Sequence, residues 1–252
     1  MHTWFALLAA GTLCGFLNAA AASGSAISLP LLLALGLPPA VANGTNRLPV
    51  LMGLATAVWR FQRAKAIPWG FTVKLIPAFV LSAVLGASLA AALPMEHIRL
   101  LVYFALLLAL ALVLLRPQRL LEAGQSADTL AITPWLQLLM AGVGFWTGLI
   151  VLDAATYLLV GLVLIGGVAL QQANAIKAVL IGLASLASLA VFASSGEVDW
   201  AAGLPLMLGS AIGGWLGAAL VLGPRARQWI VRLLILALGG EVAWMLLGLI
   251  RR

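Results

Sequence analysis

The sequence has little charge and few of the residues that soluble enzymes use for chemistry. Only 8% of its 252 residues are charged, against roughly 25% in a soluble domain, so the chain cannot cover a water-facing surface. The single Cys14 excludes an internal disulfide, and no cysteine cluster suggests a metal site. HExxH, GxSxG and P-loop patterns are missing from the sequence. We therefore expect a protein that is not an enzyme and that carries no cofactor and no metal.

What the sequence has is a series of apolar runs. Hydrophobic residues make up 64% of the chain, and the runs of about 20 residues are long enough to span a bilayer as helices. Continuous runs, rather than alternation, favour helices over a barrel. The net charge of +7 comes from basic residues that lie mostly in short loops, where they set membrane orientation. We predict an all-α, polytopic membrane protein whose surroundings are the lipid bilayer and which does not bind nucleic acid; a homo-oligomer is left open.

The two halves of the chain read as diverged copies. Rare residues match at a constant spacing of 131 positions, which is a stronger signal than leucine or alanine matches in so apolar a chain. The matched pairs are Gly36 with Gly167, Asn43 with Asn174, Phe61 with Phe192, and Trp69 with Trp200. We predict a first membrane repeat at residues 1–116, a polar linker at 117–133 and a second membrane repeat at 134–252.

Each half contains four longer apolar segments and one short one, which gives about 8–10 membrane segments. The longer segments are Trp4–Ala22, Arg47–Trp59, Gly70–Ala92 and Arg99–Leu115, then Trp135–Leu152, Lys177–Ala193, Trp200–Leu222 and Ile230–Ile250. The short pieces, Ile27–Leu35 and Tyr157–Ile165, are too brief to span alone at 1.5 Å per residue. Each could cross as part of a broken helix or turn back as a re-entrant segment.

Loop charge predicts that the repeats are inverted. Arg60, Arg63 and Lys65 place the loop that follows the third segment on the cytoplasmic side. The equivalent loop of the second half, Ser194–Asp199, carries two acids and no base. Equivalent loops on opposite sides of the membrane imply two inverted copies.

Several motifs resemble one family of bacterial membrane proteins. They are Ser23-Gly24-Ser25, Leu29-Pro30 and Ala42-Asn43-Gly44-Thr45 in the first half, with Gly196-Glu197-Val198-Asp199-Trp200 and Gly213-Gly214-Trp215-Leu216-Gly217-Ala218 in the second. With them the chain resembles the TauE/SafE sulfite-exporter family of anion transporters over nearly its full length. Where the family has a Gly-Gly-Gly break, this chain has Ser-Gly-Ser, and Asp153-Ala154-Ala155-Thr156 in the second half.

The resemblance implies a secondary transporter in the bacterial inner membrane. Its partner would be a small anionic solute such as sulfite, an organosulfonate or a related sulfur-containing or carboxylate anion, and its export could be coupled to protons. Two alternatives stay open. One is a membrane protein that keeps the fold without transporting and instead binds or assists a partner, and the other is an anion channel.

Polar residues at the two breaks are the candidates for anion binding. A helix that is interrupted within the membrane exposes N–H groups and the positive end of its dipole at the start of the second piece. The predicted substrate-binding residues are Ser23, Gly24, Ser25, Asn43, Gly44, Thr45, Asn46 and Arg47 in the first half, and Thr156, Gln172, Asn174 and Lys177 in the second. The alternatives are packing kinks at the breaks and loop bases that snorkel to the interface.

Asp153 lies in an otherwise apolar run of the second half. A carboxylate near the bilayer centre is costly unless it is protonated or paired. A permanent negative charge beside an anion would also repel it. Asp153 is therefore the candidate proton-coupling residue, and we expect it to lie near the residues of both breaks around one site.

Overall fold

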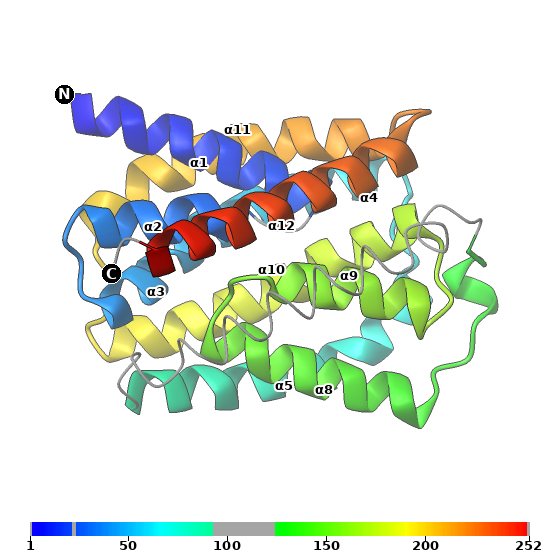
Figure 1. The fold of residues 1–252 in the computed structure, drawn as a ribbon. Helices are drawn as coiled ribbons and strands as arrows, with labels where there is room; N and C mark the ends of the chain where they lie inside the picture. The colour runs from blue at the N-terminus through cyan, green and yellow to red at the C-terminus, as the bar shows by residue number, and fades with distance from the viewer. Residues whose placement is uncertain (1, 22–23, 93–123, 251–252) are drawn as a thin grey trace.

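A computed structural model describes residues 2–21, 24–92 and 124–250, and Figure 1 shows its arrangement. Ser23 and the predicted segment Arg99–Leu115 lie outside these residues. The helices are α1 (His2–Ala20), α2 (Ser25–Ala34), α3 (Pro39–Thr45), α4 (Arg47–Arg63), α5 (Trp69–Ala92), α8 (Pro134–Leu149), α9 (Ala154–Leu164), α10 (Leu170–Ser194), α11 (Trp200–Val221) and α12 (Ala226–Ile250), with a 3₁₀ turn, η2, at Ala127–Thr129. The described ranges contain no β-strand, which confirms the all-α prediction.

Four of the described helices, α1, α5, α10 and α11, are long and apolar enough to cross a membrane. Their outward faces carry large apolar side chains that a soluble protein would bury. Leu81 and Leu85 of α5 are 67% and 65% exposed, and Ile212 of α11 is 53% exposed. Such faces fit a lipid environment. The prediction of a polytopic membrane protein is confirmed.

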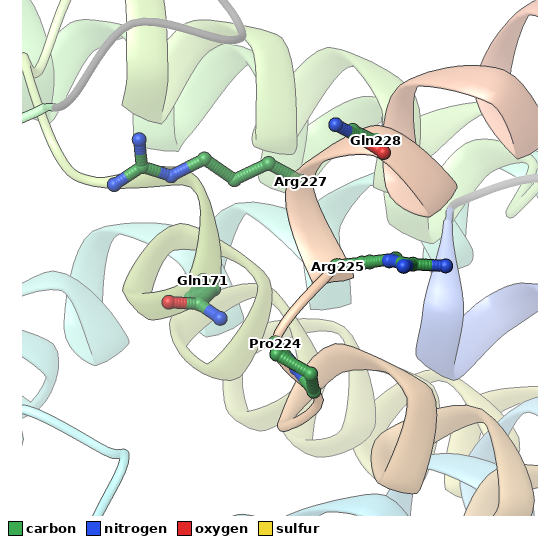
Figure 2. Close-up of a pocket in the computed structure, with 5 residues that line it drawn as sticks. All are labelled: Gln171, Pro224, Arg225, Arg227 and Gln228. Carbon is green, nitrogen blue, oxygen red and sulfur yellow. The ribbon is translucent and has the colours of Figure 1, made fainter.

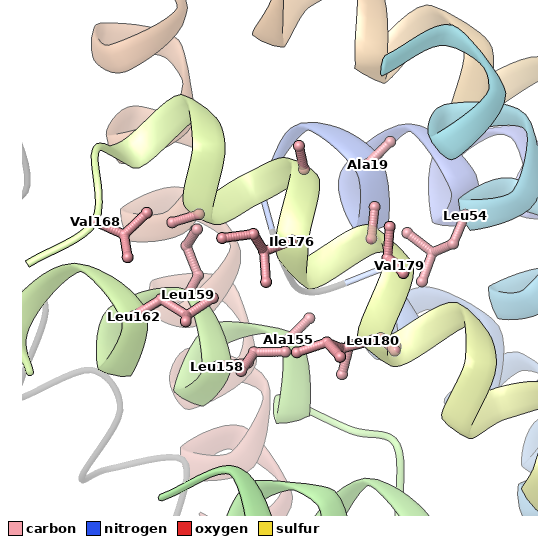
Figure 3. Packing of buried hydrophobic residues seen from close by; sticks show 14 of the residues in the cluster. Ala19, Leu54, Ala155, Leu158, Leu159, Leu162, Val168, Ile176, Val179 and Leu180 are labelled. Carbon is pink, nitrogen blue, oxygen red and sulfur yellow. The ribbon is translucent and has the colours of Figure 1, made fainter. Parts of the chain in front are cut away.

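Helix α10 is the centre of the bundle. It packs against α4, α5, α8 and α9, and most of its side chains are buried. Figure 3 shows Ile176 and Leu180 of α10 facing Leu158 of α9, with Leu54 of α4 nearby. Any polar residue that α10 carries is therefore held deep inside the protein.

The first helix of each half packs on a long helix of the other half, α1 on α11 and α8 on α5. Small residues make this close approach possible. A methyl group at Gly213 would overlap the carbonyl oxygen of Thr12, and one at Gly148 would overlap that of Ala83. The two halves are therefore interlocked rather than side by side.

The two short pieces turn back along the helix before them. Cys14 of α1 lies 3.3 Å from Ser28 of α2, and the rings of Trp146 in α8 and Tyr157 in α9 are 6.0 Å apart. Because α2 follows α1 by only a few residues, this contact requires a sharp reversal between them. The same holds for α8 and α9. The structure thus shows each short piece folding back on the helix before it, as the re-entrant alternative predicts.

The third segment of the second half begins earlier than predicted. Helix α10 starts at Leu170, not Lys177, whereas α4 starts at Arg47 as predicted and follows the separate short helix α3. The polar stretch before each predicted start looks like an interfacial loop in the sequence. In the structure Asn43 and Asn174 of these stretches are buried and hydrogen-bonded to helices of the other half, and the stretch before Lys177 is helical.

Backbone features repeat at the spacing of 131 residues that the sequence shows. Positive φ angles occur at Gly36 and Gly167, and at Lys65 and Gly196. The α4–α5 loop lies at one end of the bundle, and its equivalent, the α10–α11 loop, lies at the other end (Figure 1). This is the placement that two inverted copies predict.

Candidate functional site

The first helix break lies between the end of α1 at Ala20 and the start of α2 at Ser25. Lys177 donates from Nζ to the carbonyl oxygens of Asn18 at 2.8 Å and Ala21 at 2.5 Å. Asn174 Nδ2 donates to the carbonyl of Ala20 at 3.1 Å. Carbonyls at a helix C-terminus lack partners within the helix and carry the negative end of its dipole. Lys177 and Asn174 therefore cap the end of α1.

The start of α2 is fixed by a side chain of α1. The N–H group of Gly24 donates to Asn18 Oδ1 at 3.0 Å. A methyl group at Gly24 would overlap the carbonyl oxygen of Cys14, so only glycine lets the chain turn this closely. Ser25, the first residue of α2, is buried beside it. Asn18 therefore sets the geometry of the whole first break.

The second break lies between the end of α8 at Leu149 and the start of α9 at Ala154. The Arg47 guanidinium donates to the carbonyls of Thr147 and of Gly148, the latter at 2.8 Å. Asn43 Nδ2 donates to the carbonyl of Leu149 at 3.0 Å, and Arg47 Nη2 donates to Asn43 Oδ1 at 3.3 Å. The guanidinium also lies over the ring of Phe192, 5.2 Å from its centroid. Arg47 and Asn43 thus cap the end of α8.

The capping is reciprocal between the halves. An amide and a cation in the third segment of one half cap the first helix of the other half, across 100 or more residues of sequence. All four side chains are fully buried. The snorkelling alternative for Arg47 and Lys177 does not describe these positions, because a snorkelling base would reach the interface.

Buried side chains extend from the first break to Asn46. Ser28 donates to Asn46 Oδ1 at 2.5 Å, and Cys14 Sγ lies 3.3 Å from the Ser28 hydroxyl. Asn18 Nδ2 reaches Cys14 Sγ at 3.4 Å. Asn46 is the neighbour of Arg47 in sequence, and the Asn18 carbonyl accepts from Lys177. We call Cys14, Asn18, Ser28, Asn43, Asn46, Arg47, Asn174 and Lys177 the break cluster.

Four predicted site residues have a buried polar atom without a hydrogen-bond partner among the described residues, and one of these atoms, Asn174 Oδ1, is an acceptor. Asn46 Nδ2, Arg47 Nε and Thr156 Oγ1 are buried and have no hydrogen-bond partner within the described part of the chain. A buried donor without a partner costs about 1–3 kcal/mol, so each such group calls for an explanation. Donors of this kind are what an anion needs in place of its water.

Asp153 is the residue before α9, and its backbone is left-handed with φ 58°. Asp tolerates this conformation better than most residues do. Its carbonyl accepts from the N–H groups of Thr156 at 2.9 Å and Tyr157 at 3.1 Å, and only 2% of its surface is exposed. Asp153 is thus buried in the second break, at the N-terminal end of α9.

Three of the predicted residues lie elsewhere. Thr45 Oγ1 accepts from the N–H group of Asp199 at 2.8 Å, and Gly44 packs against the carbonyl of Glu197, so both hold the α10–α11 loop. Gln172 Oε1 accepts from the N–H group of Ala127 at 2.8 Å in the linker. Gly44, Thr45 and Gln172 therefore lie outside the break cluster.

Sequence reasoning missed Cys14, Asn18 and Ser28 in the break cluster, and Ser185 and Ser188 on α10. Asn18 is an amide in an apolar run one helical turn after Cys14, and this spacing could have marked it. The serines carry no comparable signal, since serine is common in membrane helices. Their burial without a hydrogen-bond partner among the described residues becomes visible only in the structure.

A polar pocket lies at the end of the bundle that carries the basic loops. It has a volume of about 480 Å³ and is lined by Gln171, Pro224, Arg225, Arg227 and Gln228. Figure 2 shows the two arginines leaving the α11–α12 turn on opposite sides, with Gln171 on the facing helix. Gln171 precedes Lys177 by less than two turns of α10, so the pocket lies on the solvent side of the first break.

Comparison with known proteins gives one consistent family. The model of the family described as sulfite exporter TauE/SafE matches residues 7–242. A "Probable membrane transporter protein" of Haemophilus influenzae is 29% identical over 86% of this chain and 84% of its own length. "Probable membrane transporter protein ORF9" of a Sinorhizobium species is 28% identical over 86% and 82%, and "Probable membrane transporter protein YfcA" of Escherichia coli is 26% identical over 83% and 77%. No solved structure matches the chain. The family match covers nearly the whole sequence, and the chain belongs to the sulfite exporter TauE/SafE family.

Proposed function

We propose that this protein is a secondary transporter that exports a small anion across the bacterial inner membrane. The anion is sulfite, an organosulfonate or a related sulfur-containing or carboxylate anion. It binds at the break cluster together with Thr156, and its export is coupled to protons through Asp153. The family description and the names of the relatives support transport, while the choice of an anion rests on the charges in the breaks.

The break cluster holds positive charge in the protein interior. The hydrogen bonds described for Arg47 and Lys177 go to main-chain carbonyls and to one amide oxygen. Such dipoles stabilise a cation but do not cancel its charge. The starts of α2 and α9 add the positive ends of two helix dipoles. At low dielectric these charges attract an anion strongly.

The observation that carries the proposal is the set of unpaired donors at Asn46, Arg47 and Thr156. The other polar atoms of Asn46 and Arg47 already hold the helices in place. The leftover N–H and O–H groups are then free to bind a solute. Because the cluster is buried, the arrangement favours an occluded carrier over an open channel.

The proposal also treats the two halves as inverted repeats. Support comes from the shared spacing of helices and positive φ angles, the opposite placement of the α4–α5 and α10–α11 loops (Figure 1), and the reciprocal capping. In transporters built this way, discontinuous helices of both repeats meet at a site near the middle of the membrane.

Flux through proteoliposomes tests the proposal. Vesicles are loaded with labelled sulfite, methanesulfonate or acetate, and efflux is compared with protein-free vesicles. Thr156→Val is isosteric and removes an unpaired hydroxyl, so it should raise KM for the transported anion while leaving stability unchanged. Thr147→Val is the control, because the Thr147 hydroxyl is equally buried but donates to the carbonyl of Val143 in its own helix. The absence of saturable anion efflux from the wild-type protein would refute the proposed function.

A further inference from the structure

One face of α10 connects the two breaks. Lys177, Ile181, Ser185, Ser188 and Phe192 follow one another at spacings of four, four, three and four residues. These spacings keep the five side chains within about 80° of helix rotation, and all five are buried. We call this face the α10 stripe.

A cation lies at each end of the α10 stripe. Lys177 itself caps α1 at the first break. Phe192 lies beneath the guanidinium of Arg47, which caps α8 at the second break. At 1.5 Å per residue, Lys177 and Phe192 are about 22 Å apart along the helix. An anion that passes from one break to the other must cross this distance inside the protein.

The two hydroxyls of the α10 stripe lie between these ends and have no partner among the described residues. Buried hydroxyls elsewhere in the protein donate to the carbonyl four residues before them, as in Thr147 to Val143 and Thr72 to Pro68. Ser185 and Ser188 do not make this bond. Each hydroxyl therefore keeps a donor that no described group accepts.

The hydroxyls occur in one half only. At the spacing of 131 residues, the positions equivalent to Ser185 and Ser188 are Leu54 and Ala57 of α4. Both are buried and apolar. The symmetry of the repeats therefore does not explain the serines, and packing does not need them, since their counterparts pack without a hydroxyl.

We propose that Ser185 and Ser188 line the path of the anion between the two breaks, where their hydroxyls replace its water. The class of ligand is a small oxyanion such as a sulfonate, because hydroxyl donors flanked by a cation at each end favour a negative charge over a positive one. This inference rests on the proposed function, and it adds a route along α10 rather than α4.

Cysteine reactivity tests the route without requiring the natural substrate. In a Cys14→Ala background, Ser185→Cys and Ser188→Cys are treated in lipid vesicles with sulfonatoethyl methanethiosulfonate, itself a small sulfonate. Its trimethylammonium counterpart is the cationic probe. Val179→Cys is the control, because Val179 is buried on the opposite face of α10. Both serine positions should react with the anionic reagent at least about tenfold faster than the control, and faster than with the cationic one. Reaction no faster than at Val179→Cys would overturn the route.

A second measurement uses the alanine variants. Ser185→Ala and Ser188→Ala should keep wild-type thermal stability and anion affinity but lower the maximal efflux rate about tenfold. Ser210→Ala is the matched control, because the Ser210 hydroxyl is buried but donates to the carbonyl of Pro49 at 2.5 Å; it should lose stability and keep the rate per folded protein. Wild-type rates in both serine variants would contradict the route while leaving the proposed function intact. A protein that moves no anion, yet reacts at both cysteines, would refute export and support the route.

Discussion

In both breaks a buried cation caps the end of a helix, but the cation differs. Lys177 caps the first with a single ammonium group that reaches two carbonyls. Arg47 caps the second with a planar fork that reaches two carbonyls and the Asn43 amide while lying over an aromatic ring. Arginine and lysine are not interchangeable at such positions. The comparison teaches that each half caps a helix of the other half, although the cation that does so differs between the halves.

The largest expected effect comes from removing the cations. Arg47→Met should lower the free energy of unfolding by about 4 kcal/mol and Lys177→Met by about 3 kcal/mol, because each leaves buried carbonyls unpaired at about 1–3 kcal/mol per group. Arg47 should cost more because it also holds Asn43. Unfolding in mixed detergent micelles gives both values, and a larger loss at Lys177 would contradict the described difference between the breaks.

The side-chain amides of Asn43 and Asn174 allow a second comparison of the two breaks. Asn43→Ala should cost about 2 kcal/mol and Asn174→Ala about 1 kcal/mol. Both lose one bond to a helix end, but Asn43 also accepts from Arg47, whereas Asn174 Oδ1 has no partner in the described structure. The same unfolding measurement separates them. Equal losses would show that the Asn43–Arg47 bond contributes nothing to the second break.

Asp153 tests whether only the second break is linked to protons. Asn, like Asp, tolerates the left-handed backbone at this position, so Asp153→Asn should keep the fold and anion binding. Efflux measured from about pH 5.5 to pH 8 should depend on pH in the wild-type protein and be nearly flat in the variant. A variant with the wild-type pH profile would remove Asp153 from the coupling mechanism.

The smallest effect on stability is expected from Glu197 in the α10–α11 loop. This loop and the basic α4–α5 loop lie at opposite ends of the bundle (Figure 1). Partial burial raises the pKa of the Glu197 carboxyl above its usual value. A raised pKa means that the folded protein favours the protonated form, so the charged form weakens stability as pH rises through the folded pKa. Glu197→Gln should therefore slightly raise Tm near pH 8 and have no effect near pH 4. A lower Tm of the variant at pH 8 would contradict this account.

The sequence alone predicts the helices better than it predicts their contacts. Expected segments such as Gly70–Ala92 and Trp200–Leu222 differ from α5 and α11 by one residue at one end, because apolar runs and flanking tryptophans mark membrane helices directly. The start of α10 was missed, since buried polar residues resemble a loop when their partners are unknown. The length of a helix is local information, whereas the burial of its polar positions is not.

The site shows the same limit. The sequence points to Asn43, Arg47, Asn174 and Lys177 as polar residues near the breaks. It cannot show that each pair caps a helix of the opposite half, because these bonds join residues 100 to 159 positions apart. The sequence also groups Gln172 with the breaks because of its neighbours in the chain, although its side chain turns to the linker.

Thermal stabilisation by anions tests the central claim, that a small anion binds at the break cluster. A ligand that binds only the folded state raises Tm with its concentration. Sulfite or an organosulfonate should raise Tm of the purified protein, whereas chloride at equal ionic strength should not. Asn46→Asp should abolish this rise, because it keeps an acceptor for Ser28 but replaces the unpaired donor with negative charge. An equal rise in the variant, or no rise beyond chloride in the wild-type protein, would contradict the account.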